Sequence, residues 1–184
     1  MAWIGNLIKP RLRPFARLVK NLPIDEYGDK MKKGKVLFCA SAGGHYAELL
    51  QLKALIKKYQ GVIITEKTKI THELDLPTKY VPYGSRSEGW LYFLKYFYVC
   101  LLSLGYFIKY QPAVIISTGV HSTLPLCILG WLFRRRLIYI ETVAVVNKPT
   151  ITGKIMYRLA TEFYVQWEEL LAVYPKAIYG GVLF

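Results

Sequence analysis

The sequence predicts an α/β protein built on a Rossmann-like parallel sheet, and two patterns in its 184 residues support that prediction. First, short apolar runs alternate with longer segments whose apolar residues recur at helical spacing. Alternation of this kind is typical of parallel strands joined by right-handed crossovers. Second, the first apolar run leads through a turn with two adjacent glycines into a helical segment, and turns of this type often face an anion. One domain of ordinary size fits the chain length.

The expected elements follow one another in order from residue 35. Strands are expected at 35–40, 61–65, 79–83, 113–117, 137–140, 163–166 and 178–179. Helices are expected at 46–58, 90–110, 123–133 and 153–161. The first helix would place Leu49, Leu52 and Leu55 on one face. Functional residues are expected at the carboxyl ends of the strands, where sites gather in open α/β sheets.

Composition narrows the class of partner. The net charge is +13, from 25 Lys and Arg against 12 Asp and Glu, and 53% of the residues are hydrophobic. Nucleic acid, anionic lipid or a polyanionic substrate would match that sign. No helix-turn-helix, zinc-ligand or aromatic-basic signature accompanies the charge, which disfavours nucleic acid. Cys39, Cys100 and Cys127 lie in apolar runs, as reduced and buried thiols of a cytosolic protein would.

Residues 1–24 form an amphipathic basic segment that we expect to lie on a membrane surface. Its apolar residues would fall on one side of a helical wheel and its cations on the other, with Arg11 out of place. Pro10 and Pro14 prevent one continuous helix. The alternatives are a helix packed on the domain and a disordered arm. Residues 25–34 are expected to be a linker, and 35–184 the folded domain. The residues expected at the membrane are Trp3, Ile4, Leu7, Ile8, Arg11, Arg13, Phe15, Arg17 and Lys20.

The turn after the first strand is the most informative part of the chain. It reads Ser41-Ala-Gly-Gly-His45 and opens the helix that follows. Free backbone N–H groups and the positive end of the helix dipole point the same way there, and glycine lets a phosphate approach the backbone. Ser41, Gly43 and Gly44 are therefore candidate phosphate ligands. His45 can take or give a proton near neutral pH, which makes it a candidate general base.

Further polar residues follow later strands. Ser117 and Gly119 belong to a second small-residue turn, for which a simple cap of the next helix is nearly as good an explanation. Glu141 ends an apolar strand, where an unpaired carboxylate would be costly, so it should have a partner or a substrate. The guanidinium of Arg86 is a candidate ligand for phosphate or carboxylate, which it could bind through two parallel hydrogen bonds.

Other motifs are weaker. Glu66 stands 22 residues after Gly44, near where a ribose-binding acid follows a dinucleotide fingerprint, but G-x-G-x-x-G is absent. A nucleotide-dependent oxidoreductase is therefore a distant alternative. No spacing of His, Cys and Asp resembles a zinc site, and no Gly-x-Ser-x-Gly elbow occurs. Neither metal nor serine-hydrolase chemistry is expected.

The stretch 91–108 is almost continuously apolar and just long enough to span a bilayer. Lys95 lies inside it, and strand-like segments flank it. These features favour a helix that covers the sheet and also touches lipid or a partner. The run 134–136 of three arginines is best explained as a solvated face at a helix end, with lipid contact as the alternative.

Several short motifs occur together in one order. They are Ser41-x-Gly-Gly-His-x-x-Glu48, Ser117-Thr-Gly119, Tyr139-Ile-Glu-Thr142, Thr152-Gly-Lys154, and Val165-Gln-Trp167 followed by Tyr174-Pro175. Together they resemble the membrane-anchoring, acceptor-side subunit of two-part UDP-sugar transferases. This family includes the anchor subunit of the eukaryotic dolichol-linked N-acetylglucosaminyltransferase. It also includes the enhancer subunits of bacterial capsule and exopolysaccharide β-1,4-galactosyltransferases or glucuronosyltransferases. The likeness covers about residues 35–184.

The resemblance implies half of a GT-B glycosyltransferase, whose other half is a separate UDP-sugar-binding chain. The loop at 43–45 would face a lipid-pyrophosphate sugar acceptor, with His45 as the base, and Glu141 and Arg86 would help to shape that side. No metal or other cofactor would be needed. Members often carry an arginine where Val145 stands. The residues expected at the partner interface are Gln166, Trp167, Tyr179 and Gly181.

We therefore expect a peripheral subunit on the cytoplasmic face of the cell membrane, inactive or weakly active alone. It would anchor the catalytic chain and present an undecaprenyl-pyrophosphate sugar for inverting transfer in capsule or exopolysaccharide assembly. The N-terminus does not show the uninterrupted membrane span of the eukaryotic members, which favours a bacterial protein. The alternative is a non-catalytic adaptor that only recruits and stabilises the catalytic chain.

Overall fold

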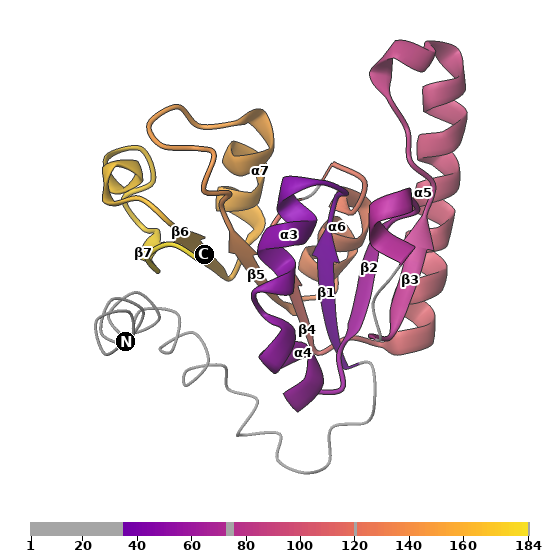
Figure 1. Ribbon diagram of the computed structural model, residues 1–184, viewed down its shortest axis with the longest axis horizontal. Coiled ribbons are helices and arrows are strands. Elements are labelled where there is room, and N and C mark those ends of the chain that lie inside the picture. Colours follow the sequence, from indigo (N-terminus) through magenta and orange to yellow (C-terminus); the bar gives the residue numbers. More distant parts are fainter. Residues whose placement is uncertain (1–34, 73–75, 120, 184) are drawn as a thin grey trace, which may run out of the picture.

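The structure is a computed structural model that describes residues 35–72, 76–119 and 121–183. The amphipathic segment and the linker predicted for residues 1–34 lie outside the described residues. Within the described part, the chain forms one seven-stranded parallel sheet in the order β3-β2-β1-β4-β5-β6-β7 (Figure 1). The predicted Rossmann-like fold is confirmed.

The strands occupy the expected apolar runs. They are β1 (Val36–Ala40), β2 (Val62–Glu66), β3 (Thr78–Val81), β4 (Val114–Ser117), β5 (Arg136–Ile140), β6 (Glu162–Val165) and β7 (Ile178–Tyr179). β1 lies centrally and pairs in parallel with both β2 and β4. Strands β2 and β3 are added on one side of β1, whereas β4 to β7 are added on the other side. The strand order therefore switches between β1 and β4, and open α/β sheets bind ligands at such a switch point.

Helices cover both faces of the sheet. They are α3 (Gly44–Leu50), α4 (Lys53–Lys58), α5 (Trp90–Tyr110), α6 (Leu124–Leu132) and α7 (Ile151–Leu159). Three short 3₁₀ segments lie in other connections: η2 (Lys69–His72) between β2 and β3, η3 (Arg86–Glu88) between β3 and α5, and η4 (Glu168–Ala172) between β6 and β7. In Figure 1, α3 and α4 lie in front of the sheet, α6 lies behind it, and α5 runs along the edge that β3 forms.

Alternate residues of the strands feed two separate cores, because successive side chains of a strand point to opposite faces. Val36, Phe38 and Ala40 of β1 pack with the apolar residues of α3 and α4. Leu37 and Cys39 pack on the other face, in a core that includes residues of α5, α6 and α7. Burial on both faces explains why the strands read as continuous apolar runs rather than as alternating ones.

Two helices differ from the prediction. The helix expected at 46–58 is broken, because α3 ends at Leu50 and α4 begins at Lys53. The turn between them is closed by backbone hydrogen bonds between residues three apart, such as the one that the Leu52 N–H donates to the Leu49 carbonyl. The helix expected at 153–161 begins earlier, at Ile151, because the Thr150 side chain caps it by accepting a hydrogen bond from the Gly153 N–H at 2.8 Å.

Candidate functional site

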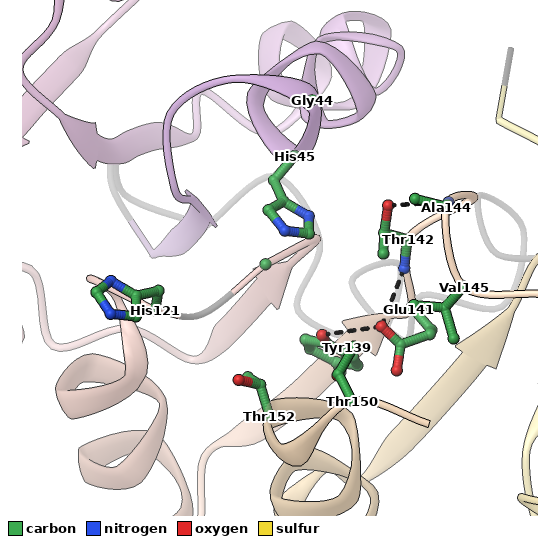
Figure 2. Close-up of a pocket in the computed structure, with 11 residues that line it drawn as sticks. Gly44, His45, His121, Tyr139, Glu141, Thr142, Ala144, Val145, Thr150 and Thr152 are labelled. Atoms are coloured by element: carbon green, nitrogen blue, oxygen red, sulfur yellow. Dashed lines mark hydrogen bonds between the residues drawn. The ribbon is translucent and has the colours of Figure 1, made fainter. Parts of the chain in front are cut away.

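A pocket of about 360 Å³ lies at the carboxyl ends of β1, β4 and β5 (Figure 2). It gathers residues from the β1–α3 turn, the β4–α6 turn, the end of β5 and the first turn of α7. The lining residues are Gly44, His45, Gly119, His121, Tyr139, Glu141, Thr142, Ala144, Val145, Thr150 and Thr152. Four predicted site residues, Gly44, His45, Gly119 and Glu141, thus come from three different loops to one cavity.

The β1–α3 turn begins the pocket wall. Gly43 adopts φ +89°, a conformation that favours glycine, and α3 begins at the next residue. The Ala42 N–H donates a hydrogen bond of 2.8 Å to the Glu66 carboxylate. Glu66 therefore holds this turn in place through one of its carboxylate oxygens. Ser41 is buried, and neither it nor Gly43 lines the pocket, so only Gly44 and His45 of this turn face the cavity.

His45 is held between the two glycine turns. A Cβ added at Gly119 would overlap the His45 ring, so the imidazole packs directly against the Gly119 backbone. The Thr118 hydroxyl also donates to the His45 carbonyl at 2.7 Å. The ring nitrogen Nδ1 is shielded from solvent without a hydrogen-bond partner among the described residues. The ring is therefore fixed by packing, and its Nδ1 edge is enclosed.

The β4–α6 turn is folded on itself. The Ser117 hydroxyl donates to the Gly119 carbonyl at 3.2 Å, and the Thr123 hydroxyl donates to the same carbonyl at 3.1 Å. The capping explanation of this turn made Ser122 or Thr123 the N-cap of the next helix. Thr123 does take the N-cap position of α6, but its side chain makes no cap hydrogen bond, and the Ser122 hydroxyl has no hydrogen-bond partner among the described residues. Ser117 supports the turn from inside. His121 lines the pocket and lies 3.2 Å from the Tyr92 hydroxyl of α5.

Glu141 is 1% exposed and has the partners that its position required. Its carboxylate accepts from the Thr142 N–H at 3.2 Å, from the Tyr139 hydroxyl at 3.4 Å and from the Tyr174 hydroxyl at 3.5 Å. Burial raises the pKa of the Glu141 carboxyl above its ordinary value of 4.5. A protonated form is therefore more accessible at this site than in water.

Gly153 in the first turn of α7 gives this carboxyl its room. A Cβ at Gly153 would overlap the Glu141 carboxylate and crowd the Tyr174 hydroxyl. The sequence analysis did not assign these two residues to the site, although both stand in the ordered motifs. Their spacing to Glu141 along the chain gives no sign of the contact.

Glu48 is a second buried carboxyl that the sequence analysis did not assign to the site. It is 2% exposed, and its carboxylate accepts from the Thr142 hydroxyl at 2.7 Å and from the Val143 N–H at 2.9 Å. Burial raises the pKa of Glu48, while its hydrogen bonds to Thr142 and Val143 and the nearby His45 act in the opposite direction. Glu48 thus ties the helix that carries His45 to the loop after β5.

Two further predicted residues are not placed in the cavity by the described structure. Arg86 begins η3, and its side chain is outside the described part of the structure. Gln166 was expected at a partner interface but is fully buried. Its amide donates to the Glu141 carbonyl at 3.0 Å and accepts from the Leu183 N–H at 2.8 Å. Any effect of Gln166 on a partner must therefore be indirect.

The remaining predicted interface residues surround the carboxyl end of the chain. The Trp167 indole donates to the Val143 carbonyl at 2.7 Å, which leaves its ring half-buried. Tyr179 is 40% exposed on β7, the edge strand. Gly181 adopts φ +73° and is buried. Tyr179 is thus the member of this set that offers an open surface.

No metal site is evident in the described residues, because no group of three or more His, Cys, Asp or Glu side chains gathers there.

One helix in the described part of the chain, α5, is long and apolar enough to cross a membrane by length and composition. Only 17% of its most apolar stretch is buried in the fold. Cys39 and Cys127 are buried as expected, whereas Cys100 on α5 is half-buried.

Known proteins match both the sequence and the fold. The profile of a family described as "Oligosaccharide biosynthesis protein Alg14 like" matches residues 87–183. The UDP-N-acetylglucosamine transferase subunit ALG14 of Mus musculus is 27% identical over 177 residues, which cover 80% of this chain and 82% of the mouse protein. The proteins of the same name from Kluyveromyces lactis and Yarrowia lipolytica are 52% and 36% identical. Those matches cover 26% and 41% of this chain, and the chain spans only 20% and 38% of the two yeast proteins.

Solved structures share the fold at low identity. MurG of Acinetobacter baumannii superposes with a TM-score of 0.57 at 14% identity, over 73% of this chain and 41% of MurG. The UDP-GlcNAc 2-epimerase of Methanocaldococcus jannaschii gives 0.53 at 12% identity, over 73% of this chain and 40% of the epimerase. In both cases the chain corresponds to less than half of a larger protein.

Proposed function

The chain belongs to the Alg14-like family of oligosaccharide biosynthesis proteins, and we propose that it is the acceptor-side subunit of a two-chain UDP-sugar glycosyltransferase. The single Rossmann-like sheet supports this proposal, because a GT-B active site lies in the cleft between two such domains. The 41% of MurG that the chain matches is about one such domain. The other chain would bind the UDP-sugar. N-acetylglucosamine is the first donor sugar to test, because the relatives are named as UDP-N-acetylglucosamine transferase subunits.

The observation that carries the proposal is the meeting of His45, Gly119 and Glu141 in one pocket at the carboxyl edge of the sheet. His45 is the candidate base for the acceptor hydroxyl. The Nδ1 edge of its ring is enclosed, so Nε2 is the nitrogen left to meet a hydroxyl in the cavity. A positioned base of this kind contributes typically about 10²–10⁴-fold to a rate.

The reaction would be a single inverting displacement. The acceptor oxygen forms a bond to the anomeric carbon of the donor sugar, and the bond from that carbon to the UDP oxygen breaks. The hydroxyl proton passes to His45, and UDP leaves with the bonding electron pair. The buried Glu141 and Glu48 carboxyls hold the loop after β5 and helix α3 in place around this base.

The acceptor would be a polyprenyl-pyrophosphate sugar. The backbone at Gly44 and the first turn of α7, with Thr150 and Thr152, line the cavity and offer N–H and hydroxyl donors to phosphate oxygens. Ser41, Gly43 and Ser117 would act by shaping the two turns, and Arg86 as a further phosphate ligand. We place Trp167, Tyr179 and Gly181 at or near the interface with the catalytic chain, with Gln166 supporting them from inside.

The setting we propose is the cytoplasmic face of a cell membrane, in capsule or exopolysaccharide assembly on an undecaprenyl carrier. The net charge of +13 and the amphipathic pattern of residues 1–24 support contact with anionic lipid. The protein would then anchor its catalytic partner as well as present the acceptor.

Reconstitution tests the proposal. UDP-sugar transfer to a lipid-pyrophosphate sugar would be measured with this chain alone, the catalytic chain alone, and both co-expressed in membranes. We expect strong product formation only with both chains. If the catalytic chain alone gives the same rate, the acceptor-side role is wrong and this chain is at most an adaptor.

A further inference from the structure

The outer face of α5 is an apolar ridge that nothing in the described structure covers. It comprises Trp90, Phe93, Leu94, Phe97, Leu101 and Ile108. Most of these recur every three or four residues, which places them on one side of the helix. Phe93 is 72% exposed and Phe97 is 64% exposed. A contiguous exposed apolar surface of this kind is typical of a site that contacts a membrane or another protein.

The opposite side of α5 is fixed to the fold. Val99, Ser103 and Phe107 are buried. The Tyr106 hydroxyl also donates to the Tyr80 carbonyl of β3 at 2.9 Å. Lipid therefore cannot surround the helix while the sheet stays packed against it. The ridge can lie in a membrane surface, but α5 cannot span the membrane in this fold.

A second exposed apolar group lies at the end of α6. The rings of Phe107 and Phe133 lie 5.1 Å apart, and Trp131, Leu132 and Phe133 are all exposed by about half or more. Exposed tryptophan on a wide apolar surface is typical of segments at a membrane interface, where the ring sits between acyl chains and headgroups. The end of α6 therefore adds a second exposed apolar group, which packs against the buried side of α5 through Phe107.

Charge favours an anionic bilayer as the occupant. From residue 89 to residue 140 the sequence contains no Asp or Glu, whereas it contains Lys95, Lys109 and the three arginines at 134–136. Lys95 pairs with Glu88 and Arg136 pairs with Glu162, so Lys109 and Arg134, both exposed, are the cations on which the charge argument rests. An apolar face with cations and without acidic residues is the pattern of an interfacial helix on anionic lipid.

The ridge and the pocket are also connected. In Figure 1 the first turns of α5 stand beyond the carboxyl ends of the strands, on the same edge as the pocket. The Tyr92 hydroxyl in those turns lies 3.2 Å from the ring of His121, which lines the pocket. A membrane in contact with the ridge would therefore lie close to the mouth of the pocket.

We propose that the outer face of α5, together with the end of α6, docks in plane on an anionic bilayer and holds the pocket beside the lipid headgroups. This inference rests on the proposed function for the use of the pocket, but the docking itself does not depend on catalysis. It adds a second membrane contact to the one expected for residues 1–24.

The test is vesicle binding by the full chain. Phosphatidylcholine vesicles with and without phosphatidylglycerol would be compared for the unmodified protein and for the double variant Phe93→Glu and Phe97→Glu. Both side chains are exposed, so we expect the variant to fold, which circular dichroism checks. We expect its affinity for anionic vesicles to fall about tenfold or more. The matched control Ile178→Glu, at the opposite edge of the sheet, should bind like the unmodified protein.

Two results would overturn the inference. The first is equal binding of anionic vesicles by the double variant and the unmodified protein. The second is that the double variant still binds vesicles but no longer co-purifies with the catalytic chain, which would make the ridge a protein interface. Transfer to a short-chain, water-soluble acceptor separates this inference from the proposed function. The double variant should keep that activity and lose transfer to vesicle-embedded acceptor. If the unmodified complex transfers to neither acceptor, the proposed function fails whatever the vesicles show.

Discussion

The pocket and the outer face of α5 are unusual in opposite ways, because the pocket buries ionisable groups and the helix exposes apolar ones. Around the pocket, the carboxyl groups of Glu48 and Glu141 are almost completely buried. On α5, aromatic side chains such as Phe93 and Phe97 are mostly exposed. Buried carboxyls and exposed apolar surfaces both cost stability, so each is expected where function requires it. On the proposed account, the pocket would bind a polar group, and the outer face of α5 would contact the apolar part of a membrane.

The largest expected effect comes from removing the base. His45→Ala should lower transfer by the two-chain complex by about 100-fold or more, because a positioned general base is lost. Co-purification with the catalytic chain should be unchanged. Lys57→Ala, at an exposed position of α4, provides the control and should keep full activity. An active His45→Ala complex would leave the pocket without its proposed chemistry.

The next effect tests how tightly the pocket is built. Gly119→Ala places a methyl group against the His45 ring, so the ring or the turn must move. We expect a loss of activity and a cost of about 1–3 kcal/mol in the free energy of unfolding, as for other overpacked sites. Activity is measured on the two-chain complex, and the free energy of unfolding is measured by urea denaturation of this chain. Unchanged activity would mean that the position of the imidazole is not critical.

A glycine on the exposed helix gives the opposite result. No atom lies within 4 Å of a Cβ built at Gly105 of α5. Gly105→Ala should therefore stabilise the protein by roughly 0.5–1 kcal/mol, because alanine loses less backbone entropy in a helix. Urea unfolding measures the gain. Destabilisation at this position would show that α5 is more enclosed than the structure indicates.

A smaller effect should appear in the pH dependence of stability. Burial raises the pKa of Glu141 in the folded state above its ordinary value of 4.5, so the folded protein binds more protons than the unfolded chain above that pH. The contribution of this group is fully present below pH 4.5 and is lost as the pH rises through the folded pKa. Glu141→Gln should therefore gain stability relative to the unmodified protein as the pH rises from acid to neutral. Urea unfolding across pH measures the difference, and a constant difference would contradict the raised pKa.

The fold could be predicted because its signals are local. Runs such as 113–117 and 137–140 are apolar, short and separated by helical patterns, and all seven expected strands are present within a few residues. The break after Leu50 was missed, because the apolar spacing continues through it while the backbone bonds do not. Periodicity reports which side of a helix is buried, and it does not report a short interruption.

The pocket could be predicted only in part. His45, Gly119 and Glu141 each follow a strand, so the sheet itself brings them together. Gly153, Tyr174 and the role of Glu48 depend on contacts across the fold, and no spacing in the chain encodes those contacts. The sequence predicted that the helix at 91–108 covers the sheet and also touches lipid or a partner, and its outer face is indeed exposed. Which side of the helix is exposed could not be predicted, because apolar residues occupy nearly every position of the run.

Cross-linking of the acceptor tests the central claim most directly. A lipid-pyrophosphate sugar with a photoreactive group on the sugar would be bound to the two-chain complex without UDP-sugar, irradiated, and the modified peptides mapped. The account predicts modification of the segments 41–50 and 141–154, which build the pocket. Modification confined to the catalytic chain would contradict it, because the acceptor would then bind elsewhere.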